Sequence, residues 1–321
     1  MLPISIVICT RGRGTELSGT LASLSKVQVP PNVSTELLLI ENGPESGSEA
    51  SDEVFQHPQI SFRHLFEPES GKSQKLNRAI KESSGEILIF SDDDVRFPTN
   101  WIERMSAPIQ LKRASAVAGG VAIAPHLLRP WMNHTHRAWL ASTSDYLDPT
   151  SPSEICGANM SVLRSALQNI GGFDLELGPG ITNGSEDTLV SWQLKQAGYS
   201  IEGALSVRVE HHFNPQRLYY SSWLNAARQK GRARAYLMYH WEHRNIPLPL
   251  LRYQYFQMKL TLRRTLTKRP TANEEGVYPW EFSYEMEKST CFHYALERNR
   301  PCRYPQPSSG SANRNQEFNF Q

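Results

Sequence analysis

The stretch ILIFSDDDVRFP, residues 87–98, runs from four apolar residues into three consecutive aspartates and ends at a proline. A short apolar run that ends at polar residues indicates a buried strand, which puts Asp92, Asp93 and Asp94 at its carboxyl end. Three adjacent carboxylates repel one another, so a fold keeps them together where a cation compensates them. Oxygen ligands of this kind select Mg²⁺ or Mn²⁺ over zinc. A solvated acidic turn is the alternative, since Asp is common in turns.

Apolar runs of strand length recur through the first 125 residues and decide the fold class. Segments with the helical spacing of apolar residues, 16–25 and 72–82, lie between them. Strands that alternate with helices imply a mostly parallel sheet whose carboxyl edge carries the functional residues. The aspartate run stands at such an edge. The predicted strands are 4–9, 36–40, 60–64, 86–90 and 116–123.

The next part of the chain has weaker periodicity. Residues 124–154 contain Pro, His and Trp and predict a long loop or a partly helical insert near the site. Its histidines, His126, His134 and His136, lack a Cys or acidic partner at metal-ligand spacing, so we expect them at the acceptor side or exposed. A helix at 189–197 and a strand at 206–209 follow.

Positive charge is concentrated in one segment. The net charge is +2, but residues 216–270 hold twelve Lys and Arg and one Glu, a charge of +11 that leaves −9 for the remainder. Helical spacing predicts an amphipathic helix at 218–238 and another within 274–298. We therefore expect a first domain at 1–215, a basic and aromatic helical region at 216–302 and a tail at 303–321 whose polar composition predicts disorder.

The basic segment also holds nine aromatic residues. This composition fits contact with an anionic membrane surface, and it also fits nucleic acid or an anionic glycan. A third interpretation is a helical cap whose aromatic residues pack on the first domain.

Composition limits the class of protein and its location. The chain has 321 residues, 39% of them hydrophobic, which is enough for one large or two ordinary domains. No apolar run approaches the roughly 20 residues of a spanning helix, and the first residues lack the features of a secretory signal. The four cysteines form no C-x-x-C pair, so we expect reduced thiols in a cytoplasmic protein.

Further motifs stand in a fixed order around the aspartate run. Together they resemble family 2 glycosyltransferases, nucleotide-sugar-dependent enzymes with the glycosyltransferase-A fold, and the resemblance covers about residues 1–215. The ordered set is much more specific than the aspartates alone. The motifs are ISIVICTR (4–11), LLLIENGPESG (37–47), GK (71–72), NRAI (77–80), GANMS (157–161), GGFD (171–174) and GSED (184–187).

The resemblance implies an α/β fold with a mixed, mostly parallel central sheet flanked by helices, of the Rossmann-like glycosyltransferase-A type, and a C-terminal helical basic extension. It also implies a donor site for a nucleoside-diphosphate sugar. The family more often has Asp where this chain has Glu41, and Lys72 either contacts the diphosphate or is solvated. The implied donor residues are Thr10, Arg11, Glu41, Lys72, Asp92 and Asp93, and the implied metal ligand is Asp94.

The resemblance places the acceptor side in the GSED motif. Inverting transfer needs a carboxylate that removes the proton of the acceptor hydroxyl. Asp187 is implied as this base, and Glu186 as the residue that orients the acceptor. Without the resemblance, the same residues are an ordinary acidic helix start. One histidine of His211-His212 resembles a family residue near the metal or diphosphate, and His212 is preferred.

The implied function is a metal-dependent, inverting glycosyltransferase that uses Mn²⁺ or Mg²⁺. It would move a sugar from a nucleoside diphosphate, of which uridine diphosphate is the first choice, to a hydroxyl of a saccharide or lipid-linked acceptor in polysaccharide biosynthesis. Because relatives act on such acceptors, we expect peripheral contact with the inner, anionic membrane surface, and no nucleic acid partner. The competing hypotheses are a sugar-phosphate nucleotidyltransferase and a catalytically silent protein that binds nucleotide sugars or glycans.

Overall fold

The structure is a computed structural model that describes residues 1–12, 14–43, 55–182 and 184–306. It divides into two compact units, Met1–Ile181 with Glu186–Pro215 and Thr182–Ser185 with Gln216–Gln321. Of the predicted tail, residues 307–321 lie outside the described part of the chain. Within the described part, no helix combines the length and the apolar character that crossing a membrane requires.

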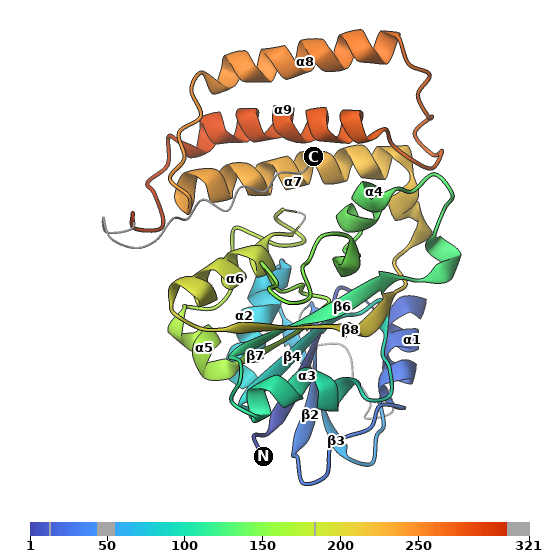
Figure 1. Cartoon of the computed structure of the whole chain (residues 1–321), viewed down its shortest axis with the longest axis vertical. Coiled ribbons are helices and arrows are strands. Elements are labelled where there is room, and N and C mark those ends of the chain that lie inside the picture. Colours follow the sequence, from blue (N-terminus) through green and yellow to red (C-terminus); the bar gives the residue numbers. More distant parts are fainter. Residues whose placement is uncertain (13, 44–54, 183, 307–321) are drawn as a thin grey trace. The chain divides into compact units, whose positions relative to one another are not determined.

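One sheet of eight strands forms the described core of the first unit (Figure 1). The strands are β1 (Ile4–Thr10), β2 (Thr35–Asn42), β3 (Ile60–Glu67), β4 (Ile87–Asp92), β5 (Val95–Arg96), β6 (Ala116–Ile123), β7 (Asn159–Leu163) and β8 (Ile201–His211). They lie in the order β3-β2-β1-β4-β7-β6-β8-β5. β1 pairs in parallel with β2 and β4, β2 with β3, and β6 with β8. β7 runs antiparallel to β4 and β6, and β5 antiparallel to β8. The predicted mixed, mostly parallel α/β fold is confirmed.

Helices cover both faces of this sheet, which explains why its central strands are apolar throughout. Ile4, Ile6 and Ile8 of β1 join a core with α1 and α3, whereas Val7 and Cys9 point into the core with α2 and α6. The helices of this unit are α1 (Thr15–Leu24), α2 (Lys72–Glu82), α3 (Trp101–Gln110), α4 (His134–Trp139), α5 (Arg164–Asn169) and α6 (Glu186–Gln196).

The insert after β6 is partly helical, as the sequence indicates. It contains α4 and two short 3-10 turns, η2 (Pro125–Leu127) and η3 (Thr143–Asp145). Of the two expectations for its histidines, the acceptor side or exposure, exposure does not hold for His136, which is buried. His136 completes the N-cap of α4: its backbone N–H donates to Asn133 Oδ1 at 3.1 Å, and its Nδ1 accepts from Asn133 N at 3.3 Å.

The side chain of Asn159 in β7 forms hydrogen bonds with α3, β6 and β8. It is fully buried; its Oδ1 accepts from Trp101 Nε1 at 2.9 Å, and its Nδ2 donates to the carbonyls of Gly120 and Val207 at 2.8 and 2.9 Å. The register of β6 against β8 shifts between Gly119 and Gly120. A Cβ on Gly119 would lie 2.3 Å from Asn159 Nδ2, so this close approach requires glycine.

The second unit contains three helices in its described residues, α7 (Tyr220–His240), α8 (Pro249–Thr265) and α9 (Pro279–Glu297), and η4 (Pro215–Leu218) leads into α7. α9 packs against both α7 and α8. A Cβ on Gly231 of α7 would lie 2.4 Å from the carbonyl of Met286, so the two helices approach closely there. The helices predicted near 218–238 and within 274–298 correspond to α7 and α9, whereas α8 was not predicted.

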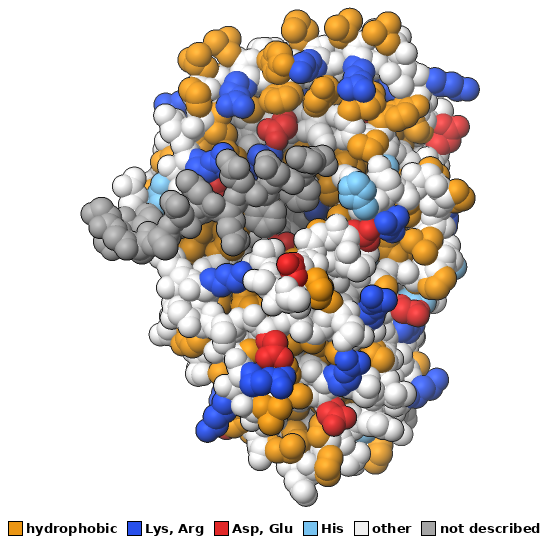
Figure 2. Space-filling view, viewed as in Figure 1, with side chains coloured by type: hydrophobic (Ala, Val, Ile, Leu, Met, Phe, Trp, Pro, Cys, Tyr) orange, Lys and Arg blue, Asp and Glu red, His pale blue; other side chains and the backbone are white. Residues whose placement is uncertain are grey.

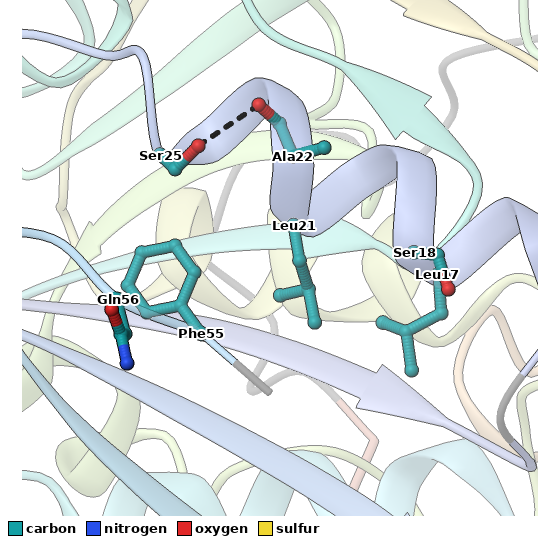
Figure 3. Close-up of a pocket in the computed structure, with 7 residues that line it drawn as sticks. All are labelled: Leu17, Ser18, Leu21, Ala22, Ser25, Phe55 and Gln56. Carbon is teal, nitrogen blue, oxygen red and sulfur yellow. Dashed lines mark hydrogen bonds between the residues drawn. The ribbon is translucent and has the colours of Figure 1, made fainter. Parts of the chain in front are cut away.

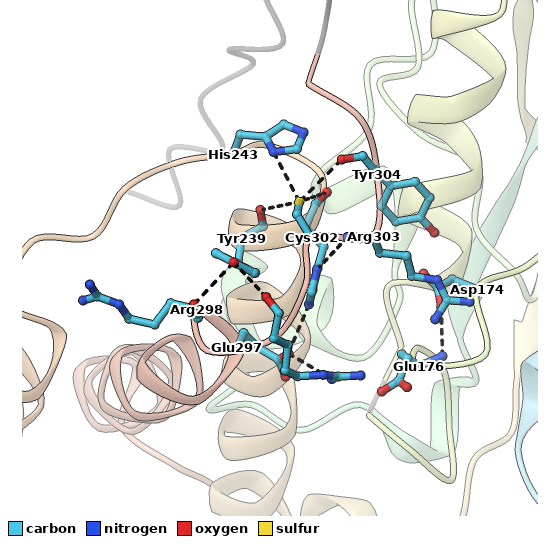
Figure 4. A network of polar contacts seen from close by, with 11 residues as sticks. Asp174, Glu176, Tyr239, His243, Glu297, Arg298, Cys302, Arg303 and Tyr304 are labelled. Atoms are coloured by element: carbon cyan, nitrogen blue, oxygen red, sulfur yellow. Dashed lines mark hydrogen bonds and ion pairs between the residues drawn. The ribbon is translucent and has the colours of Figure 1, made fainter.

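A polar network fixes the chain that follows α9 (Figure 4). Tyr239 Oη donates to the carbonyl of Arg300 at 2.9 Å, and His240 Nε2 lies 3.1 Å from Glu297 Oε2. Arg303, at the start of the predicted tail, donates its backbone N–H to His240 Nδ1 at 3.2 Å. The chain therefore stays attached to α7 beyond the end of α9.

Candidate active site

The donor-side residues meet at the carboxyl edge of the sheet because their strands are neighbours. Thr10 stands opposite Glu41 in the β1–β2 register, and Cys9 stands opposite Asp92 in the β1–β4 register. Thr10 is buried, and its Oγ1 donates to the carbonyl of Gly12 at 2.9 Å. Arg11 follows it and is exposed. Parallel pairing thus brings together residues that lie more than eighty positions apart.

Glu41 is held by a histidine of the next strand. His64 Nε2 lies 3.0 Å from Glu41 Oε2, and the His64 ring lies 4.5 Å from that of Phe66. This carboxylate therefore has a fixed position at the end of β2. Residues 44–47 of the same predicted motif lie outside the described part of the chain.

Lys72 connects the donor side to the GSED motif. It is the first residue of α2, and its Nζ donates to Asp92 Oδ1 and lies 3.8 Å from Glu186 Oε1. Burial alone would lower the pKa of Lys72, but the carboxylates of Asp92 and Glu186 outweigh burial and raise that pKa well above its ordinary value. Lys72 is therefore a cation held between the half-buried Asp92 and the buried Glu186, and the interpretation of Lys72 as a solvated residue is wrong.

Glu186 and Asp187 start α6 in different environments. Glu186 is buried, and burial together with the charge of Asp187 raises the pKa of Glu186 to about 7, against the opposing effect of Lys72. Glu186 Oε2 has no hydrogen-bond partner among the described residues. A buried carboxyl oxygen without a partner is costly unless a ligand completes it.

Asp187 is oriented by two backbone donors. Gly157 N donates to its Oδ2 and Thr188 N to its Oδ1, both at 2.8 Å. A Cβ on Gly157 would lie 3.4 Å from both Asp187 Oδ2 and Lys72 Nζ, so these two groups are near neighbours across that glycine. The GANMS and GSED motifs thus meet within reach of the aspartate run.

Asp93, the middle residue of the aspartate run, has a raised pKa. Burial, with the charges of Asp92 and Asp94, raises the pKa of Asp93 to about 6, although hydrogen bonding to Thr10 acts in the opposite direction. Its backbone carbonyl accepts from Thr20 Oγ1 at 2.7 Å. Lys75, one turn after Lys72 on α2, is buried close by and donates to the carbonyl of Thr10 at 2.7 Å.

The histidine at Asp94 is His211, not the preferred His212. His211 Nε2 lies 3.3 Å from Asp94 Oδ1, and His211 is buried. The ring of His212 lies instead 5.2 Å from that of His126, and its Nε2 lies 3.3 Å from Glu210 Oε2. β8 alternates, with Val207, Val209 and His211 on its buried side, so the signal was present in the sequence.

Asp94 and His211 are the two side chains that could bind a cation at this edge of the sheet. No group of three metal-ligating side chains is assembled in the described residues. One carboxylate with one imidazole suits an Mn²⁺ or Mg²⁺ ion that takes its remaining ligands from water and substrate phosphates, which is how such ions commonly bind beside nucleotides. The residues therefore fit a cation shared with a diphosphate and do not fit a cage made of protein ligands alone.

A hollow of about 420 Å³ lies beside α1 (Figure 3). It is lined by α1 and by Phe55 and Gln56, with no charged side chain. We assign it no part in the site.

Residues 5–171, about half of the chain, match the family model described as glycosyl transferase family 2. The chain belongs to this family. Succinoglycan biosynthesis protein ExoM of Rhizobium meliloti (strain 1021) is 32% identical over 122 residues, which is 37% of this chain and 39% of that protein. The match thus spans well under half of this curated relative.

Two solved structures share the fold. The mannosyltransferase PcManGT from Pyrobaculum calidifontis, in complex with GDP-Man and Mn²⁺, aligns with a TM-score of 0.55 and 14% identity over 93% of this chain and 87% of that chain. GalNAc-T7 with UDP, GalNAc and Mn²⁺ aligns with a TM-score of 0.51 and 16% identity over 94% of this chain and 58% of that chain. At these identities the likeness establishes the glycosyltransferase-A-like fold.

Sequence reasoning missed one residue beside the aspartate run and gave another second place. Lys75 was not predicted and His211 was the second choice after His212, yet both are buried against the aspartate run. Lys75 lies three positions after Lys72 on a predicted helix, so helical spacing alone puts both cations on one face. The other predicted residues, from Thr10 to Asp187, come together at one edge of the sheet.

Proposed function

We propose that this chain is a metal-dependent, inverting glycosyltransferase. It transfers a sugar from a nucleoside-diphosphate donor, with uridine diphosphate the first choice, to a hydroxyl of a saccharide or lipid-linked acceptor in polysaccharide biosynthesis. The observation that carries the proposal is Lys72, whose ammonium lies between Asp92 of the aspartate strand and Glu186 of the GSED motif. Donor-side and acceptor-side residues are therefore in contact range in one unit.

The donor would lie along the carboxyl edge of β1, β2 and β4. Thr10, Arg11 and Glu41 stand where a nucleoside and its phosphates would pass, with Asp92 at the ribose and Asp93 supporting it. Lys72 and Arg11 supply positive charge for the diphosphate. Both solved neighbours named above carry a nucleoside diphosphate or its sugar together with Mn²⁺, which supports the donor class and the choice of cation.

Asp94 and His211 would hold the cation, a role that moves from His212 to His211 on the geometry of β8. A bound Mn²⁺ or Mg²⁺ would neutralise charge that grows on the leaving diphosphate. Lys72, which donates to Asp92, would offset part of the same negative charge. With these groups in place, the leaving diphosphate takes the electron pair of the bond to the anomeric carbon.

Asp187 would remove the proton of the acceptor hydroxyl as the hydroxyl oxygen bonds to the anomeric carbon. Its two backbone hydrogen bonds fix the carboxylate, as a base at a defined position requires. Glu186, buried beside it, would receive a hydrogen bond from the acceptor at the unpartnered Oε2. Attack from the face opposite the diphosphate inverts the anomeric centre.

The decisive experiment is Asp187→Asn. Asn can still accept the Gly157 hydrogen bond but cannot take a proton, so transfer should fall by about 10²- to 10⁴-fold. Donor affinity, measured by calorimetry with Mn²⁺, should change little. Asp148→Asn, a conservative change at an exposed aspartate of the same unit, is the matched control. Turnover that survives in D187N would remove Asp187 as the base.

Two further measurements complete the proposal. A thermal-shift screen of nucleotide sugars with Mn²⁺ should select one donor, because a ligand that binds the native state raises its stability. Pyrophosphate release from a nucleoside triphosphate and a sugar phosphate would instead indicate a nucleotidyltransferase.

We also propose a cytoplasmic location, supported by the four free thiols, Cys9, Cys156, Cys291 and Cys302.

A further inference from the structure

Helix α8 exposes an unusual number of large apolar side chains. Leu251, Tyr255, Met258, Leu262 and Leu266, at its C-cap, are 47–80% exposed. Their spacing of three and four residues places them on one stripe along the helix. Figure 2 shows hydrophobic side chains over this helix with basic ones beside them. Contiguous apolar patches of this kind mark interaction sites.

The opposite face of α8 is already occupied. Phe256 and Leu260 belong to it, and Arg264 binds Glu281 and Glu285 of α9 at 2.6 and 2.8 Å. α8 is therefore a preformed helix that is held in place by α9, and its second apolar face is exposed in the part of the chain that the structure describes. Binding of a partner to this face therefore carries no free-energy cost for folding the helix.

Basic residues follow one flank of the stripe. Arg252, Lys259 and Arg263 are seven and four residues apart, which places them on one side of the helix, and residues 243–273 contain seven Lys and Arg and no acid. Lys259 Nζ lies 4.6 Å from the Tyr255 ring centroid, and the Arg263 guanidinium lies 4.6 Å from that of Trp280. Cations placed on aromatic rings beside an apolar stripe suit a region where lipid headgroups meet acyl chains.

We propose that α8 lies flat on an anionic lipid bilayer, with its apolar stripe inserted and its basic flank against the headgroups. A second copy of this chain fits less well, because two stripes in contact would bring two basic flanks together without an acid on either helix. Nucleic acid fits less well, because its charged and polar surface does not pack against exposed Leu and Met side chains. With 17 residues and several charges, α8 does not reach across a bilayer but can lie along its surface.

The test is sedimentation of the full chain with phosphatidylcholine vesicles that contain or lack phosphatidylglycerol, at low and high salt. We expect binding to the anionic vesicles, weakened by salt. Met258→Ser with Leu262→Ser should lower affinity by about tenfold or more. Arg252→Gln with Lys259→Gln should lower affinity by about fivefold per charge. None of these residues is among those assigned to the proposed catalytic machinery.

Matched controls separate this surface from general stickiness. Leu111→Ser and Leu296→Ser remove leucines that are 64% and 51% exposed on other helices, and both should bind like the unmodified chain. Equal binding to neutral and anionic vesicles, or no loss in the Met258 and Leu262 variant, would overturn the proposal. A lipid-free dimer that dissociates in that variant would overturn it in favour of a second copy.

Discussion

Lys72 offers the sharpest test of the site's electrostatics. In Lys72→Gln, Asp92 and Glu186 lose the cation that lies between them. At 3.8 Å, the attraction between Lys72 and Glu186 is worth roughly 4 kcal/mol at an effective dielectric constant of about 20. Removing one member of a buried ion pair costs about 3–5 kcal/mol, so both estimates agree.

The pH dependence separates charge from packing. The pKa of Glu186 is raised from 4.5 to about 7, so its ionisation destabilises the fold progressively between those values and no further above pH 7. Without Lys72 that pKa rises further, so the stability of K72Q should continue to fall above pH 7. The gap in unfolding free energy between K72Q and the unmodified chain should then widen by about 1.4 kcal/mol per pH unit.

Urea unfolding at pH 6 and pH 9 measures this gap. Lys72→Arg, which keeps the charge, should show little widening. In a Glu186→Gln background, the widening caused by K72Q should be clearly smaller, and what remains comes from Asp93, whose pKa of about 6 is also lowered by Lys72. A gap that does not change between pH 6 and pH 9 in the chain with Glu186 would mean that Lys72 acts by packing, and the charge argument would fail.

Two other substitutions test the geometry. His211→Gln should raise the Mn²⁺ concentration needed for half-maximal activity by tenfold or more, whereas His212→Gln should leave it nearly unchanged; the reverse order would restore His212 as the ligand. Gly119→Ala should lower the free energy of unfolding by about 1–3 kcal/mol, since its Cβ would lie 2.3 Å from the fully bonded side chain of Asn159. Thermal unfolding of G119A within 1 °C of the unmodified chain would contradict that contact, because about 1 kcal/mol corresponds to a few degrees.

Strands of continuous apolar residues were predictable because both faces of this sheet are covered. β6 was predicted with the bounds it has, and so was helix α2. α3 was missed because Pro108 stands inside it, and a proline inside a helix counts against it in any sequence pattern. β7 was missed because it lies antiparallel between β4 and β6, a position that no local pattern specifies.

α8 was not predicted, although the contrast between its apolar and polar faces is no weaker than in α7 and α9, which were predicted. Its apolar residues lie on two faces, one packed on α9 and one exposed, and only the packing of α8 on α9 shows which face is which.

Most of the predicted site residues meet at one edge because parallel strands end there, a consequence of topology that the sequence order already implied. The sequence did not reveal which side chains compensate the acids. Lys72 and Lys75 approach from α2, about twenty residues before the aspartates, and only the packing of α2 on the sheet brings them there. The choice between His211 and His212 depended on strand alternation, which fixes the side of the sheet.

Lys72 should also couple the two halves of the site. If Lys72 Nζ binds a donor diphosphate, it no longer pairs with Glu186. The pKa of Glu186 then rises above about 7, because the positive charge that lowered it is gone. Donor binding near pH 8 should then be accompanied by proton uptake, which calorimetry in two buffers of different ionisation enthalpy measures directly. The uptake should become much smaller in Glu186→Gln while donor affinity remains. Uptake of the same size in that variant would place the proton elsewhere and separate Glu186 from the donor.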